Sequence, residues 1–113
     1  MIDEIRNYHF NPELFEAYKA WARTRAIPYL SSKMQVLGFW ANTAEPSEVN
    51  GAPLDGLGSA NITWIIRWRD MDHRNAGLSA ALQSPEWAEI FSHVPGGRGS
   101  YLRTESKFAE TLA

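Results

Sequence analysis

Three polar side chains with complementary chemistry lie close together near the start of the sequence. Glu4, Arg6 and Tyr8 are spaced by two residues in an expected strand, and alternate side chains of a strand point to the same face of a sheet. Arg6 could hold a carboxylate or enolate while Glu4 fixes the guanidinium and Tyr8 donates a hydrogen bond, a combination suited to polarising a carbonyl group. The same residues also fit a structural ion pair at a dimer interface or cavity wall.

His73 is the candidate general acid or base, because histidine is the side chain most often used for proton transfer near neutral pH. It stands near the start of an expected helix. Its neighbours Asp72 and Arg74 are polar and favour a solvent-exposed position instead. His9 and His93 have no partner visible in the sequence, and we assign them structural or surface roles.

Two further patterns have both a functional and a simpler interpretation. Trp64 and Trp68 alternate with polar residues along one expected strand, which suits an aromatic pocket but is more commonly the pattern of a core. The run from Gly96 to Gly99, with Arg98 inside it, could form an anion-binding turn. A turn into the last strand explains the same glycines more simply.

Composition excludes several classes of protein. The chain has 113 residues, 44% of them hydrophobic, no cysteine and a net charge of -2. One domain over residues 1–113 is expected. The charge argues against a nucleic-acid partner, and the lack of cysteine excludes disulfides and thiolate metal sites. No signal peptide or membrane span is recognised, so we expect a cytoplasmic protein with no membrane partner. No metal or nucleotide motif is found, and we expect no cofactor.

Local signals predict six main elements. Strands are expected at residues 2–10, 34–43, 61–69 and 100–109, a helix from Pro12 to Ser31 with a kink or break near Thr24 to Ile27, and two short helices capped by Asp70 or Asp72 and by Ser84. Gly38 permits a bulge in the second strand. The stretch 44–60 is rich in proline and glycine and is expected to be a loop of the kind that often serves as a lid.

This order of elements predicts an α+β, ferredoxin-like βαββαβ fold, in which both helical segments cover one face of a four-stranded antiparallel sheet. The opposite face would then be bare and rich in aromatic residues. Such a patch is larger than a monomer usually exposes, so we expect a homodimer with the two sheets packed face to face.

Three stretches resemble the NIPSNAP family within the dimeric α/β barrel superfamily. The first runs from Ile2 to Tyr8 and leads into the helix at Pro12, the second is Leu37-Gly38-Phe39-Trp40, and the third is Trp68 to Arg74 with the later Ser84-Pro85-Glu86-Trp87. Together they span nearly the whole chain. The 44–60 loop looks longer than in the family, and Asn7 replaces a common threonine.

The resemblance implies a small-molecule pocket between the sheet and the helices, and members of the superfamily include monooxygenases, cyclases and isomerases. By similarity to the cofactor-independent oxygenases, an asparagine and tryptophans would flank an aromatic substrate. The candidate catalytic residues are thus Arg6, Tyr8 and His73. The candidate substrate-binding residues are Glu4, Asn7, Trp40, Asn61, Trp64, Trp68 and Trp87.

We therefore expect a small-molecule-binding protein that acts on an aromatic or polyketide-like substrate as a cofactor-independent cyclase, isomerase or monooxygenase. Two alternatives remain. One is a non-catalytic binding or interaction module, which a packed interior would favour over a polar cavity beneath the 44–60 loop. The other is a haem-binding monooxygenase, for which the resemblance would make His73 the axial ligand, with Asn7 and Trp64 or Trp68 beside it.

Overall fold

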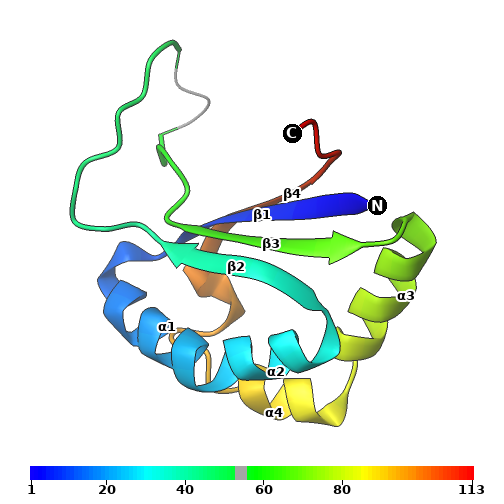
Figure 1. Ribbon diagram of the computed structural model, residues 1–113. Helices are drawn as coiled ribbons and strands as arrows, with labels where there is room; N and C mark the ends of the chain where they lie inside the picture. The colour runs from blue at the N-terminus through cyan, green and yellow to red at the C-terminus, as the bar shows by residue number, and fades with distance from the viewer. Residues whose placement is uncertain (53–55) are drawn as a thin grey trace.

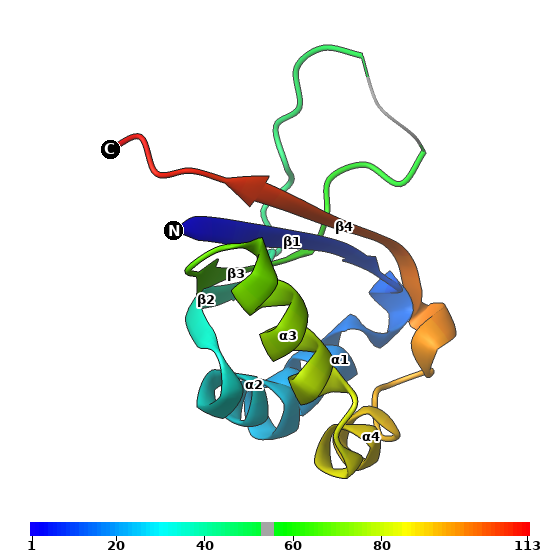
Figure 2. The ribbon, with the colours of Figure 1, turned by 90° about the vertical axis from the view of Figure 1, so that its right-hand side faces the viewer.

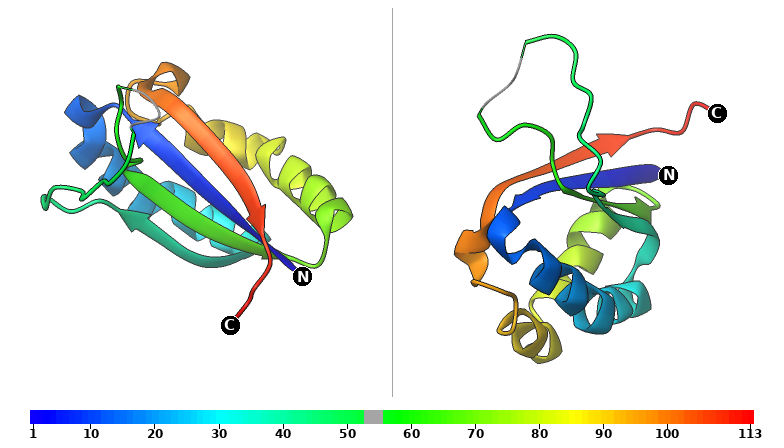
Figure 3. Two further views of the ribbon diagram at one scale, coloured as in Figure 1. Left: turned by 90° about the horizontal axis from the view of Figure 1, so that it is seen from above. Right: turned by 90° about the vertical axis from the view of Figure 1, so that its left-hand side faces the viewer.

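Four antiparallel strands form one sheet, and the helices pack against one of its faces (Figure 1). The computed structural model describes residues 1–52 and 56–113. The strands are β1 (Ile2–Phe10), β2 (Gln35–Ala41), β3 (Ile62–Trp68) and β4 (Tyr101–Ala109). They lie in the order β2-β3-β1-β4 (Figure 3). This order, with helices after β1 and after β3, confirms the predicted ferredoxin-like fold.

The helices begin where the sequence provides caps. They are η1 (Pro12–Leu14), α1 (Phe15–Trp21), η2 (Ala22–Ala26), α2 (Ile27–Lys33), α3 (Met71–Leu82) and α4 (Pro85–Phe91), with the short turn η3 (Arg98–Ser100) before β4. The side chains of Asn11, Asp70 and Ser84 each accept a backbone N–H of the first turn. Within residues 1–52 and 56–113, no helix has the length and apolarity needed to cross a bilayer.

The first helical segment widens near its middle. The kink or break predicted near Thr24 to Ile27 takes the form of a π-helical turn over Ala22–Ala26, after which the helix continues as α2 to Lys33 instead of ending at Ser31. The N–H of Ile27 bonds to the carbonyl of Ala22, five residues earlier. Pro28 therefore follows a widened turn, in which its ring is accommodated without ending the helix.

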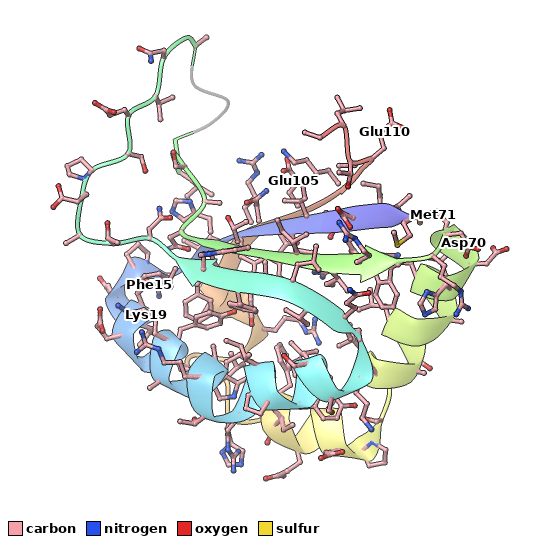
Figure 4. All side chains as sticks on the ribbon, viewed as in Figure 1. Phe15, Lys19, Asp70, Met71, Glu105 and Glu110 are labelled. Atoms are coloured by element: carbon pink, nitrogen blue, oxygen red, sulfur yellow. The ribbon has the colours of Figure 1, made fainter. Side chains whose placement is uncertain are left out.

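The two faces of the sheet have opposite character. The helix-facing side chains of β3, namely Ile62, Trp64, Ile66 and Trp68, are at most 4% exposed. They join Phe10, Tyr18 and other buried residues in a single core cluster. The opposite face was expected to be rich in aromatic residues, and this is wrong. Its central positions are Ile5 and Ile65, which pair across β1 and β3, surrounded by polar side chains such as Glu105 (Figure 4).

The described residues of the 44–60 loop rise from the sheet on the side away from the helices (Figure 2). Residues 53–55 of this loop lie outside the described residues. Gly58, Ser59 and Ala60 contact the open face of the sheet, where they line a small polar hollow with residues of β1, β3 and β4. The expectation that this loop covers a cavity between sheet and helices is therefore wrong for its described part.

We predict that Asn61→Ala lowers the free energy of unfolding by about 1–3 kcal/mol, because it leaves buried backbone groups without hydrogen-bond partners. The Asn61 Oδ1 atom accepts the N–H of Phe10 at 2.8 Å, and its Nδ2 atom donates to the carbonyl of Phe10 at 2.9 Å. Phe10 is fully buried. Urea denaturation measures the loss.

The control is Asn42→Ala, which removes a single exposed hydrogen bond to the carbonyl of Ala60. We expect this variant to stay within about 0.5 kcal/mol of the wild type. Equal losses of unfolding free energy in the two variants would show that the Asn61 side chain stabilises the fold no more than an exposed hydrogen bond does.

Candidate functional site

Glu4, Arg6 and Tyr8 point together from β1 toward the helices. The carboxylate of Glu4 is fully buried, whereas the side chain of Arg6 is 17% exposed. The Arg6 Nη1 atom donates to Glu4 Oε2 at 2.8 Å, and the Arg6 Nε atom donates to the hydroxyl of Tyr8 at 2.8 Å. The spacing by two residues thus brings all three groups into one hydrogen-bonded row, as the strand geometry predicts.

A second arginine reaches the same carboxylate from α3. The Arg74 Nε and Nη2 atoms donate to the two oxygens of Glu4 at 3.1 and 2.9 Å, which is a bidentate pair. The indole N–H of Trp68, at the end of β3, donates to Glu4 Oε1 at 3.1 Å. Four donated hydrogen bonds therefore satisfy the buried carboxylate.

These contacts keep Glu4 ionised. Burial by itself would raise the pKa of the Glu4 carboxyl, but the hydrogen bonds from Arg74 and the charge of Arg6 outweigh it, so the pKa lies below its ordinary value. Burial alone would lower the pKa of the Arg6 guanidinium, and the contacts with Tyr8 and Glu4 more than reverse that effect. The cluster thus holds one negative and two positive charges.

The hydroxyl of Tyr8 can donate one further hydrogen bond. Its oxygen accepts the N–H of Arg6 at 2.8 Å and the indole N–H of Trp64 at 3.0 Å. A tyrosine hydroxyl has one hydrogen to donate in addition. The Arg6 Nη2 atom likewise makes no hydrogen bond to the described part of the chain. Tyr8 and Arg6 therefore offer donors to a ligand.

Both residues line a cavity of about 680 Å³ between the sheet and the helices, which opens to solvent. Aromatic rings form much of its wall: Tyr8, Tyr18, Trp21, Phe39, Trp64, Trp87, Phe91 and Tyr101. Phe39 and Trp64 stack with ring centroids 5.4 Å apart. The guanidinium of Arg6 lies 5.5 Å from the Trp64 ring centroid. This is an aromatic-walled cavity with a cation at its floor.

The polar groups around the cavity are donors and cations. Burial raises the pKa of Tyr101 to about 12, and burial together with the hydroxyl of Tyr101 raises the pKa of Tyr18 still further, so both remain neutral phenols. Arg98 lies at the lining with its guanidinium 4.9 Å from the Phe91 ring centroid. No Asp, Glu or His among the described residues lines the cavity. The cavity therefore suits an anionic rather than a cationic ligand.

His73 lies apart from the cavity. Its Nδ1 atom accepts the backbone N–H of Arg69 at 3.1 Å, and its ring packs edge-on against Trp68 at 5.1 Å. Neither contact places it beside Arg6 or Tyr8, and it is not in the lining. The haem arrangement would also need Asn7, whose side chain bonds to Thr63 and Glu105 on the open face of the sheet. These residues do not converge and do not fit a haem.

The other candidate substrate-binding residues fall into three groups. Trp64 and Trp87 line the cavity. Glu4 and Trp68 lie behind it, where they hold Arg6 in place. Asn61 and Trp40 are elsewhere, since Asn61 bonds to the backbone of Phe10 and Trp40 is 52% exposed.

A bulge explains the position of Trp40. The register between β2 and β3 shifts between Val36 and Gly38, so Phe39 takes the position opposite Trp64. The alternation of side chains is thereby reversed, and Trp40 turns to the open face, where its ring lies over Gly38.

The sequence did not single out Arg74 or the two tyrosines Tyr18 and Tyr101. Arg74 appeared only as a polar neighbour of His73 and within the stretch from Trp68 that carries the resemblance. Arg98 was identified within the glycine-rich run as part of a possible anion-binding turn. The fold brings Arg74 to Glu4 and brings Tyr18, Arg98 and Tyr101 to the cavity lining.

The comparisons with known proteins agree with this fold. The family model NIPSNAP matches residues 3–98. No curated protein matches the chain. The chain is similar to a solved NIPSNAP domain protein from Burkholderia xenovorans, with a TM-score of 0.75 and 14% identity over 100% of this chain and 96% of that chain.

Two further solved structures are similar. A NIPSNAP family protein of unknown function from Agrobacterium tumefaciens has a TM-score of 0.74 and 18% identity over 96% of this chain and 86% of that chain. An antibiotic biosynthesis monooxygenase has a TM-score of 0.59 and 11% identity over 100% of both chains. At these identities the likeness is one of fold.

The lowered pKa of Glu4 predicts a pH-dependent contribution to stability. A carboxyl whose pKa is lower in the folded than in the unfolded state stabilises the protein above the unfolded pKa, and this contribution is lost as the pH falls through the folded pKa. We therefore expect Glu4→Gln to be destabilising at pH 7, with a gap to the wild type that narrows as the pH falls below about 4.

Urea denaturation between pH 3 and 7 measures this gap, and Glu13→Gln is the control because Glu13 is exposed. The control should follow the wild-type profile. A gap for Glu4→Gln that stays constant over the whole range would contradict the ionised state of Glu4.

Proposed function

The chain belongs to the NIPSNAP family, and from this premise we propose that its cavity binds a small aromatic or polyketide-like molecule through an oxygen anion. The observation that carries the proposal is the pair of free donors, Arg6 Nη2 and the Tyr8 hydroxyl, on the floor of an aromatic-walled cavity. As an enzyme, the protein would be a cofactor-independent cyclase, isomerase or monooxygenase.

The two donors support a role in oxyanion stabilisation. Tyr8 is fixed by two accepted hydrogen bonds, and Arg6 is fixed by Glu4 and Tyr8. Donors held in place before the reaction stabilise charge that develops on a carbonyl or enol oxygen without reorganising. The neighbouring rings of Phe39 and Trp64 are stacked and would hold a planar substrate against this pair.

A second function, a non-catalytic binding module, is favoured by one specific observation. Removal of a proton from carbon needs a base within hydrogen-bond reach, and the described lining contains neither a carboxylate nor a histidine. Under this alternative the cavity would bind and release the anion unchanged. Turnover of a bound enolisable aromatic ketone, followed by solvent deuterium incorporation, separates the two functions.

We further propose that the protein is a homodimer in which the open faces of the two sheets pack against each other. Ile5 and Ile65 are apolar and central on that face, and Trp40 is exposed beside them on β2. Burial of these side chains against a second copy would remove apolar surface from water. The mixed polar surroundings are typical of an interface whose apolar part is central.

We expect Arg6→Gln to weaken binding of 1-naphthoate about tenfold or more, because a charge-assisted hydrogen bond is lost. Tyr8→Phe removes a neutral donor and should weaken binding by a smaller factor, about threefold to tenfold. Quenching of tryptophan fluorescence reports binding, since Trp64 and Trp87 line the cavity.

Two controls accompany these variants. Arg23→Gln changes an exposed arginine on η2 and should leave the affinity unchanged. The neutral analogue 1-naphthalenemethanol should bind the wild type and Arg6→Gln about equally. If Arg6→Gln bound 1-naphthoate as tightly as the wild type does, Arg6 would not be the anion site.

For the dimer, Ile65→Lys places a charge at the centre of the open face and should convert the protein to a monomer. Light scattering coupled to size-exclusion chromatography measures the mass, and Leu102→Lys on edge strand β4, where the leucine is 47% exposed, is the control. A wild-type mass of one chain would contradict the proposed homodimer.

A further inference from the structure

The buried carboxylate of Glu4 is shared unequally between two arginines. Arg74 donates to both of its oxygens, whereas Arg6 donates to one of them. Arg74 has two further contacts that hold it in place, a hydrogen bond from Nη1 to Asn75 Oδ1 at 3.1 Å and the ring of Phe108, whose centroid lies 5.1 Å from its guanidinium carbon. Arg74 is therefore the principal partner of Glu4.

The positive charge that Glu4 does not neutralise lies on Arg6. Glu4 carries one negative charge, and Arg6 and Arg74 carry one positive charge each. Of these three groups only Arg6 lines the cavity. If Glu4 were paired with Arg6 alone, the two charges would cancel and the floor of the cavity would be electrically neutral. The second arginine leaves a net charge of one at the floor, on the side that a ligand can reach.

We propose that Arg74 is a positioning residue that determines the charge of the ligand: by holding Glu4, it leaves the positive charge of Arg6 available to one anionic group. This inference rests on the proposed function and deepens it, because it names the substrate class. The ligand is an aromatic molecule with an anionic group, a carboxylate, sulfonate or enolate, at the end that meets Arg6 and Tyr8.

The charge count leads to a test that a purely structural role cannot imitate. Arg74→Gln leaves Glu4 and Arg6 with no net charge. The double variant Glu4→Gln/Arg74→Gln returns the cluster to one positive charge, but it has two fewer ionic contacts than the wild type. A structural role predicts that the double variant is damaged at least as much as the single one. A charge-setting role predicts that the second substitution restores binding.

The probes are 1-naphthoate as the anion and 1-naphthalenemethanol as its neutral counterpart, with binding measured by tryptophan fluorescence at pH 8. We expect Arg74→Gln to weaken binding of 1-naphthoate about tenfold, the scale of a charge interaction in a partly desolvated site. Binding of the alcohol should change by less than about twofold, and the double variant should regain most of the lost affinity for 1-naphthoate.

The opposite face of the sheet provides a matched control. Arg67 on β3 makes a bidentate pair with Asp3 on β1, with N–O distances of 2.8 and 2.9 Å. Arg67→Gln removes a bidentate ion pair that is more exposed and lies outside the cavity lining, and it should not alter the ratio of the two affinities. An equal change of this ratio in Arg67→Gln and Arg74→Gln would overturn the inference, as would an unchanged ratio in Arg74→Gln.

Two outcomes separate this inference from the proposed function. If the wild type binds neither probe, or binds both equally, the proposed anion site is wrong. If the wild type prefers 1-naphthoate and the double variant fails to recover that preference, the proposed function stands and the role of Arg74 is refuted. Should Arg74→Gln not fold, Glu4→Gln must bind 1-naphthoate at least about threefold more tightly than the double variant, because it keeps two unbalanced arginines.

Discussion

A single buried carboxylate imposes the main constraint on this protein. Glu4 is fully buried on the helix-facing side of β1, and a buried charge without partners costs several kcal/mol or more. Its donors come from three elements: Arg6 on β1, Trp68 on β3 and Arg74 on α3. The pairing of β1 with β3 and the approach of α3 to the sheet must all be correct at once for the carboxylate to be satisfied.

The same constraint organises the cavity. Arg6 is held by Glu4 on one side and Tyr8 on the other, and Tyr8 is held in turn by the indole of Trp64. A chain of hydrogen bonds thus runs from the interior to the wall of the cavity. Glu4 and Tyr8 accept hydrogen bonds within this chain, which leaves Arg6 Nη2 and the hydroxyl hydrogen of Tyr8 as donors for the cavity. The rigidity of the core and the polarity of the cavity therefore have a common origin.

The parts of this arrangement that depend on local signals were predictable. Alternation of apolar residues predicted β3 and β4, strand-forming residue types predicted β2, and the caps at Asp70 and Ser84 predicted α3 and α4. The row of Glu4, Arg6 and Tyr8 followed from a spacing of two residues. All of these depend on neighbours within a few positions along the chain, where sequence and geometry are directly linked.

The remaining parts depend on contacts that no local pattern reveals. Arg74 meets Glu4 across 70 positions of the chain, and its helix gives no sign of which side chain will reach the sheet. Trp40 changed face because of one bulge beside Gly38. His73 stands one residue before Arg74, and the rotation of α3 brings the arginine rather than the histidine to the buried carboxylate.

The π-helical turn at Ala22–Ala26 gives the first helical segment one residue more than an α-helix of the same rise would hold. Each residue of an α-helix advances the side-chain direction by about 100°. The extra residue therefore rotates the side-chain directions of α2 relative to those of α1. Trp21 lies before this turn and Leu30 after it, and both line the same cavity. A chain with one residue more or fewer here would present a different helix surface to the cavity while retaining the same sheet.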